Sequence, residues 1–112
     1  MDKLNYYRQI IQTILTEKSK IKPIGGDIET ETIFDEKTDR YLLVHLGWNE
    51  QERIYYCVLH LEIKNEKIWI QNNQTDQSLV EDLINEGVPK KDIILGLKPA
   101  YVREYLAVEM VS

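Results

Sequence analysis

The hydrophobic positions of the first eighteen residues recur every three or four residues. This is the period of an amphipathic helix, and polar side chains fill the opposite side. We therefore predict a helix from Asp2 to Lys18. Pro23 and the Gly25-Gly26 pair end the periodicity and predict a connecting loop. The apolar positions are Tyr6, Tyr7, Ile10, Ile11, Ile14 and Leu15.

Four segments rich in β-branched and aromatic residues follow, and each predicts a strand. They cover residues 28–34, 41–48, 54–64 and 67–71. The polar segments between them have the length of hairpin connections, so the simplest arrangement is a four-stranded antiparallel meander. A two-residue turn at Asn65-Glu66 would pair Lys64 with Lys67 and Ile63 with Ile68.

Strict alternation along these strands predicts two faces of the sheet. We expect the nearly all-apolar face to form the core under the helices, with Leu42, Val44, Leu59, Leu61, Ile63 and Ile68 buried. Its members are Leu42, Val44, Leu46, Trp48, Tyr55, Cys57, Leu59, Leu61, Ile63, Ile68 and Ile70. The opposite face mixes aromatic, apolar and polar side chains: Tyr41, Leu43, His45, Ile54, Tyr56, Val58, His60, Glu62, Trp69 and Gln71. It is too apolar to be left wholly to water. We expect the C-terminal segment, a second copy of the chain or another protein to cover it.

A second helix is predicted from Asp76 to Glu86. Thr75 is the expected N-cap, and Gly87 and Pro89 form the stop signal. Pro99 is placed to open a last helical turn, whereas the short apolar run at 93–97 is compatible with more than one state. The predicted fold class is α+β. It has an N-terminal helix, a four-stranded antiparallel meander, and one or two C-terminal helices packing on the sheet, in one domain over residues 1–112.

Composition narrows the class of protein. The chain has 112 residues, 43% hydrophobic and 29% charged, which is ordinary for a globular domain. No run approaches the roughly 20 apolar residues of a membrane-spanning helix. The single cysteine, Cys57, lies in an apolar strand and fits a reducing compartment, so we expect a cytoplasmic protein.

The charge distribution argues against a dedicated nucleic-acid-binding module. The net charge is -5, while phosphate neutralisation by Lys and Arg supplies most nonspecific affinity. The first 22 residues nevertheless carry five basic residues against two acidic ones. Binding of DNA through this basic N-terminal helix therefore stays open as an alternative.

Two groups of side chains are candidates for chemistry. His45, His60 and Glu62 share one predicted sheet face, but a catalytic zinc needs three protein ligands at close spacing, and two histidines are too few. Glu62-Ile63-Lys64 has the E-x-K form of metal-dependent nucleases, in which carboxylates hold magnesium and a lysine steadies the attacking water. With so many charged residues the triplet also arises by chance. We predict no catalytic residues, no metal and no cofactor, and keep a nuclease using Glu62 and Lys64 as an alternative.

Four segments read, in order, MDKLNYYRQIIQTIL, DIETETIFDEKTDRYLLVHLGW, RIYYCVLHLEIKNEKIWIQ and GVPKKDIILGL. In this combination they resemble the XisI family of cyanobacterial fdxN element excision-controlling factors. Asn65-Glu66 departs from the family, which more often has a glycine in this turn, and the tail after Tyr105 follows no pattern that we recognise in the family. The resemblance implies a non-enzymatic role in DNA recombination during heterocyst differentiation. The expected partners are a XisH-like protein and a site-specific recombinase that performs the chemistry.

A small acidic domain without a recognisable set of catalytic residues is what we expect of an accessory protein that works through protein contacts. A homo-oligomer is compatible with the same surface. Aromatic side chains are enriched at interfaces, and neighbouring polar groups can fix the register of a partner. The predicted partner-binding residues are Tyr41, His45, Arg53, Tyr56, His60, Trp69 and Gln71.

Overall fold

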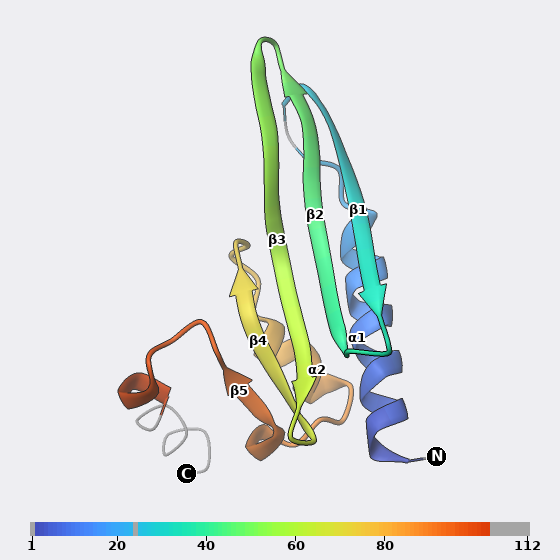
Figure 1. Ribbon diagram of the computed structural model, residues 1–112, viewed down its shortest axis with the longest axis vertical. Helices are drawn as coiled ribbons and strands as arrows, with labels where there is room; N and C mark the ends of the chain where they lie inside the picture. The colour runs from blue at the N-terminus through green and yellow to red at the C-terminus, as the bar shows by residue number, and fades with distance from the viewer. Residues whose placement is uncertain (1, 24, 104–112) are drawn as a thin grey trace.

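The computed structural model describes residues 2–23 and 25–103, and Figure 1 shows their arrangement. One sheet has the strand order β1-β2-β3-β4-β5, and the helices α1 and α2 both lie on one face of it. The elements are α1 (Lys3–Ser19), β1 (Asp27–Asp35), β2 (Arg40–Asn49), β3 (Glu52–Lys64), β4 (Lys67–Asn73), α2 (Leu79–Asn85), a 3-10 turn η1 (Lys90–Asp92) and β5 (Ile93–Leu95).

The α+β class, the N-terminal helix and the four-stranded antiparallel meander are confirmed. The sheet also has a fifth strand that the sequence did not predict. This strand, β5, pairs parallel with β4 through Ile68 with Ile93 and Ile70 with Leu95. A parallel pair needs a crossover connection, which α2 and η1 supply here. A last helical turn follows Pro99, whose carbonyl accepts from the amides of Val102 and Arg103.

The helix ends follow their capping side chains. The Asp2 carboxylate accepts from the amide of Asn5 and starts α1, close to the predicted boundary. The second helix is shorter than predicted, because Ser78 rather than Thr75 is its N-cap and accepts from the amide of Glu81. Thr75 instead donates its hydroxyl to Asn73 in the preceding turn. Within residues 2–23 and 25–103, no helix is long and apolar enough to cross a membrane.

The tight turn between β3 and β4 is confirmed with its predicted register. Lys64 pairs with Lys67 and Ile63 with Ile68. Asn65 and Glu66 both have positive φ, 55° and 62°, as a type I′ turn requires. Asparagine tolerates this conformation well, which explains how the turn forms without glycine.

Two β-bulges interrupt the alternation of the sheet, and the first of them reverses part of the predicted faces. Leu43 pairs with Leu59 but Val44 pairs with Cys57, so Val58 is an extra residue in β3. In β4, Ile70 pairs with Leu61 and Asn72 pairs with His60, so Gln71 between them is also an extra residue. A bulge shifts the alternation of side chains by one residue. The sheet face of the residues before Val58 therefore cannot be predicted by counting every second residue from those after it.

The corrected faces follow from the observed pairing. Tyr41 and Leu43 were predicted on the open face, but they pair with the core residues Leu61 and Leu59 and therefore point to the helices. Tyr56 pairs with His45 on the same helix side. The opposite, outer face carries residues that were predicted as core: Leu42, Leu46, Trp48, Tyr55 and Cys57.

The core lies between the sheet and the two helices. Ile11 and Leu15 of α1 and Leu83 of α2 are fully buried in it. Of the six positions predicted as buried, Val44, Leu59, Leu61, Ile63 and Ile68 are confirmed. Leu42 is wrong, since it is only partly buried on the outer face, and Val44 is buried outside the main core cluster.

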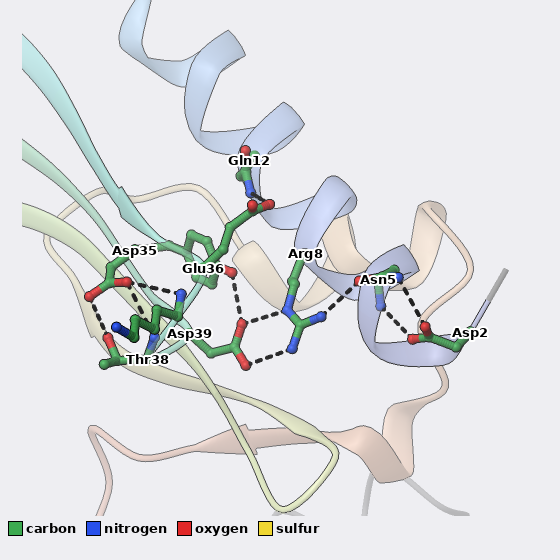
Figure 2. A network of polar contacts seen from close by, with 10 residues as sticks. Asp2, Asn5, Arg8, Gln12, Asp35, Glu36, Thr38 and Asp39 are labelled. Atoms are coloured by element: carbon green, nitrogen blue, oxygen red, sulfur yellow. Dashed lines mark hydrogen bonds and ion pairs between the residues drawn. The ribbon is translucent and has the colours of Figure 1, made fainter.

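A polar network fastens α1 to the turn between β1 and β2 (Figure 2). Arg8 donates from Nε and Nη2 to the two carboxylate oxygens of Asp39, at 2.7 and 3.1 Å. The hydroxyl of buried Tyr41 donates to the same carboxylate at 2.9 Å. The hydrogen bond from Arg8 is the main reason that the pKa of Asp39 lies below its usual range. The network therefore holds Tyr41 in the core by its polar end.

Candidate protein-interaction surface

The β2–β3 hairpin extends the sheet well beyond β4 and the helices (Figure 1). We call this part the distal arm; it consists of residues 27–30, 45–48 and 53–56, which pair with one another. Gly47 permits the close approach of β1 here, because a Cβ at this position would lie 2.0 Å from the backbone oxygen of Asp27. The arm therefore presents sheet surface that α1 and α2 do not cover.

The outer face of the distal arm carries an aromatic cluster around one cation. Trp48 and Tyr55 are 52% and 68% exposed. The Arg53 guanidinium lies 5.6 Å from the Trp48 ring and 5.8 Å from the Tyr55 ring, within cation–π range. Aromatic and arginine side chains in this arrangement are typical of binding hot spots.

An acidic row borders this cluster on β1. Asp27 pairs with Trp48 and Glu29 with Leu46, so both carboxylates lie beside the aromatic side chains on the outer face. Asp27, Glu29, Leu46, Trp48 and Arg53 together line a shallow hollow. Its mixture of acidic and aromatic groups suits a partner that offers basic and apolar side chains.

His45 and Tyr56 form a pair on the helix side of the arm. A ring nitrogen of His45 is 3.1 Å from the Tyr56 hydroxyl, and the two rings meet edge to face at 5.3 Å. Burial lowers the pKa of His45, so the imidazole is neutral at pH 7. Tyr56 stays 47% exposed, so this pair adds a second polar and aromatic surface at the arm.

His60 and Glu62 lie on the outer face nearer the base of the sheet. His60 Nε2 is 2.9 Å from the Glu62 carboxylate, and Arg40 approaches the same group at 4.0 Å. The nuclease alternative would need this carboxylate beside Lys64, but the Lys64 ammonium lies over the Trp69 ring at 4.4 Å. In the part of the chain that the structure describes, no group of three or more His, Cys, Asp or Glu side chains could hold a metal ion.

Trp69 and Gln71 lie where the chain folds back after β5. Trp69 donates its indole N–H to the Lys64 carbonyl, and the Arg103 guanidinium lies 5.6 Å from its ring. Gly96 packs so closely on Gln71 that a Cβ there would lie 2.5 Å from the amide oxygen. Both side chains are therefore half-buried by the chain's own segment 96–103.

The predicted partner-binding residues thus occupy separate places. Arg53 and Tyr56 are exposed on the arm with His45 beside them, while His60, Trp69 and Gln71 lie on the outer face toward the base. Tyr41 is corrected: it is 0% exposed and part of the core. Strict alternation missed Trp48 and Tyr55 because it placed them inside. Their position next to the polar turn 49–52 is the sequence signal that could have found them.

The basic residues of α1 are engaged within the chain. Lys3 pairs with Asp92 at 2.9 Å, Arg8 with Asp39 at 2.7 Å and Lys18 with Asp82 at 3.0 Å. Lys20 pairs with Glu17 at 3.2 Å. Four of the five basic residues among the first 22 therefore already have a carboxylate neighbour.

Comparisons with known proteins agree on one family. The XisI protein family matches residues 1–108. The chain is similar to the crystal structure of a XisI-like protein from Anabaena variabilis, with 38% identity, a TM-score of 0.86, and coverage of 91% of this chain and 94% of that one. It is also similar to the fdxN element excision controlling factor XisI from the same organism, with 34% identity, a TM-score of 0.80, and coverage of 91% and 99%. No curated protein matches the chain.

Proposed function

Because the chain belongs to the XisI protein family, we propose that it is a non-catalytic accessory factor that controls excision of a DNA element. It acts through protein contacts beside a site-specific recombinase, and its direct partner is a XisH-like protein. The relative that covers 91% of this chain at 34% identity is named an excision controlling factor, which supports this role.

The observation that carries the proposal is the outer face of the distal arm. An exposed tryptophan and tyrosine around one arginine, bordered by carboxylates, form a compact surface of the composition found at protein interfaces. Trp48 is the expected anchor, because large aromatic side chains contribute most to binding when a partner covers them. His60, Trp69 and Gln71 extend the same face toward the base and supply polar contacts at its rim.

The test is association of the full chain with the XisH-like protein of the same organism, measured by calorimetry on the purified pair. We expect Trp48→Ala to weaken binding by at least about thirty-fold, the loss of a 2 kcal/mol hot spot. Tyr101→Ala is the matched control, since Tyr101 is an even more exposed aromatic residue, at 75%, outside the arm. It should leave the affinity unchanged.

Two results would contradict the proposal. One is binding that Trp48→Ala and Arg53→Ala leave intact, which would place the docking surface elsewhere. The other is magnesium-dependent cleavage of DNA by the purified chain that Glu62→Gln abolishes, which would make the protein an enzyme. In the proposed role, the chain alone leaves DNA uncut, and excision depends on it only when the recombinase is present.

A further inference from the structure

The strand β3 is much longer than its neighbour β4. Pairing with β4 covers only Leu59 to Lys64, and the pairs of β3 with β2 continue outward to Glu52. Figure 1 shows the distal half of β3 with β2 on one side and no strand on the other. Within residues 2–23 and 25–103, the segment from Glu52 to Tyr56 is therefore an open edge of the sheet.

The backbone groups that point out of this edge can be identified. The Cys57 carbonyl accepts from the side chain of Asn72 at 2.9 Å, so the backbone of Cys57 faces the β4 side of the sheet. Backbone direction alternates from residue to residue along a strand, so the N–H and C=O groups of Tyr55 and Arg53 face the same side. A row of such groups is a template for another strand.

The two long edges of the sheet differ in how they are protected. The other edge, β1, carries Asp27, Glu29, Glu31 and Asp35, and these charges would repel a second copy of the same strand. The open segment of β3 has one acid and one base, Glu52 and Arg53, and neither lysine nor proline. This segment is thus neutral and aromatic, and it lacks the features that prevent an edge strand from pairing with another chain.

We propose that a second copy of this chain pairs with this edge, β3 against β3, around a two-fold axis at Ile54. In that register Arg53 and Tyr55 of one copy lie opposite Tyr55 and Arg53 of the other and exchange backbone hydrogen bonds. Glu52 lies opposite Tyr56, so no like charges meet. An axis at Tyr55 would instead place Arg53 opposite Cys57, whose carbonyl is already bound by Asn72.

A two-fold pairing of identical strands closes on itself, whereas β3 against the β1 edge of another copy would form an open filament or a larger ring. The two sheets become one continuous sheet, and the exposed Tyr55 side chains gain cross-strand contacts with the arginines opposite. The inference goes beyond the proposed function and does not rest on it. It concerns the purified chain alone, so its failure is distinguishable from failure to bind a XisH-like protein.

The first test is the mass of the full chain in sedimentation equilibrium. We expect a dimer of twice the 13.3 kDa chain mass. Tyr55→Lys places a lysine opposite Arg53 of the second copy and should raise the dimer dissociation constant about ten-fold or more. Adding Arg53→Glu makes this pair complementary and should restore the dimer. The matched control Glu31→Lys, on the β1 edge, should leave the wild-type dimer intact.

The second test reports the register directly. Opposite residues at a non-hydrogen-bonded position have Cα atoms about 4.5 Å apart, within reach of a disulfide. Ile54→Cys in a Cys57→Ser background should therefore oxidise to a covalent dimer, whereas Thr32→Cys on the β1 edge should not. A 13.3 kDa species at concentrations up to about 1 mM, a dimer insensitive to Tyr55→Lys, or cross-linking at Thr32→Cys but not at Ile54→Cys would each overturn the proposal. Pairing of the β3 edge that is seen only after another protein is added would also overturn the proposal.

Discussion

The base of the sheet and its distal arm are formed by the same two strands, β2 and β3, yet they have opposite surroundings. At the base, Tyr41 and Leu61 pair with each other under α1, and the Tyr41 hydroxyl reaches Asp39. In the arm, Trp48 and Arg53 pair with each other and lie open to solvent. The backbone pairing is the same in both regions. At the base the helices cover the sheet and its side chains stabilise the fold, whereas in the arm the side chains stay exposed and available for binding.

The base and the arm each contain an arginine, and the two arginines have different roles. Arg8 is partly buried between α1 and the β1–β2 turn, where it makes two hydrogen bonds to one carboxylate. Arg53 contacts two aromatic rings in solvent and donates only a long hydrogen bond of 3.4 Å to the Gly47 carbonyl. The first arrangement fixes the position of an element of the fold, and the second keeps a cation accessible to a partner.

The largest expected effect comes from truncating the base. Tyr41→Ala removes a fully buried aromatic ring and the hydroxyl that donates to Asp39, and it should lower the free energy of unfolding by about 3 to 5 kcal/mol. Tyr55→Ala, in the arm, is the matched control and should cost less than about 1 kcal/mol. Urea denaturation monitored by circular dichroism measures both. Equal losses for the two tyrosines would abolish the distinction between base and arm.

An intermediate effect is expected from Asp39→Asn. The change removes the charge that faces Arg8 and weakens the hydrogen bond from Tyr41, which should cost about 1 to 3 kcal/mol at pH 7. Asparagine tolerates the positive φ of 55° at this position, so the backbone turn is preserved. Asp76→Asn, at an exposed aspartate, is the control and should stay near the wild-type stability.

The same variant gives a pH signature. The pKa of Asp39 is lower in the folded chain than in the unfolded chain, mainly through the hydrogen bond from Arg8. Its stabilising contribution is therefore complete above the unfolded pKa of about 4 and is lost as the pH falls through the lowered folded value. Unfolding measured from pH 7 to pH 2 should show a smaller acid loss in Asp39→Asn than in the wild type. Parallel curves would contradict the network in Figure 2.

The smallest effect on stability is expected in the arm. Arg53→Ala removes exposed cation–π contacts and should change the free energy of unfolding by less than about 0.5 kcal/mol. Lys64→Ala, which removes a cation 4.4 Å from the centre of the Trp69 ring near the base, serves as its counterpart. Thermal melts of the two variants should nearly coincide with the wild type. A large loss for Arg53→Ala alone, at a protein concentration where the wild type is monomeric, would show that the arm contributes to folding and is not only a binding surface.

Local features of the fold could be predicted because their causes are local. The apolar spacing in α1, the β-branched runs of the four antiparallel strands and the Asn65-Glu66 turn all depend on residues a few positions apart. The strand β5 could not be predicted, because three residues acquire strand geometry only through pairing with β4. The start of α2 depended on which of two nearby hydroxyls, on Thr75 or on Ser78, reaches the first free amides.

The surface was harder to predict than the fold, and the reason is geometrical. The sequence by itself determined that β3 alternates apolar and polar residues, that Leu59, Leu61 and Ile63 belong to the core, and that aromatic side chains gather near the turn at 49–52. Only the tertiary structure decided which tyrosine is buried. The extra residue Val58 arises from the pairing of two strands, and it reverses the facing of every residue beyond it. Tyr55 thereby reached the surface, whereas Tyr41 lies in the core because the register of β2 places it opposite Leu61.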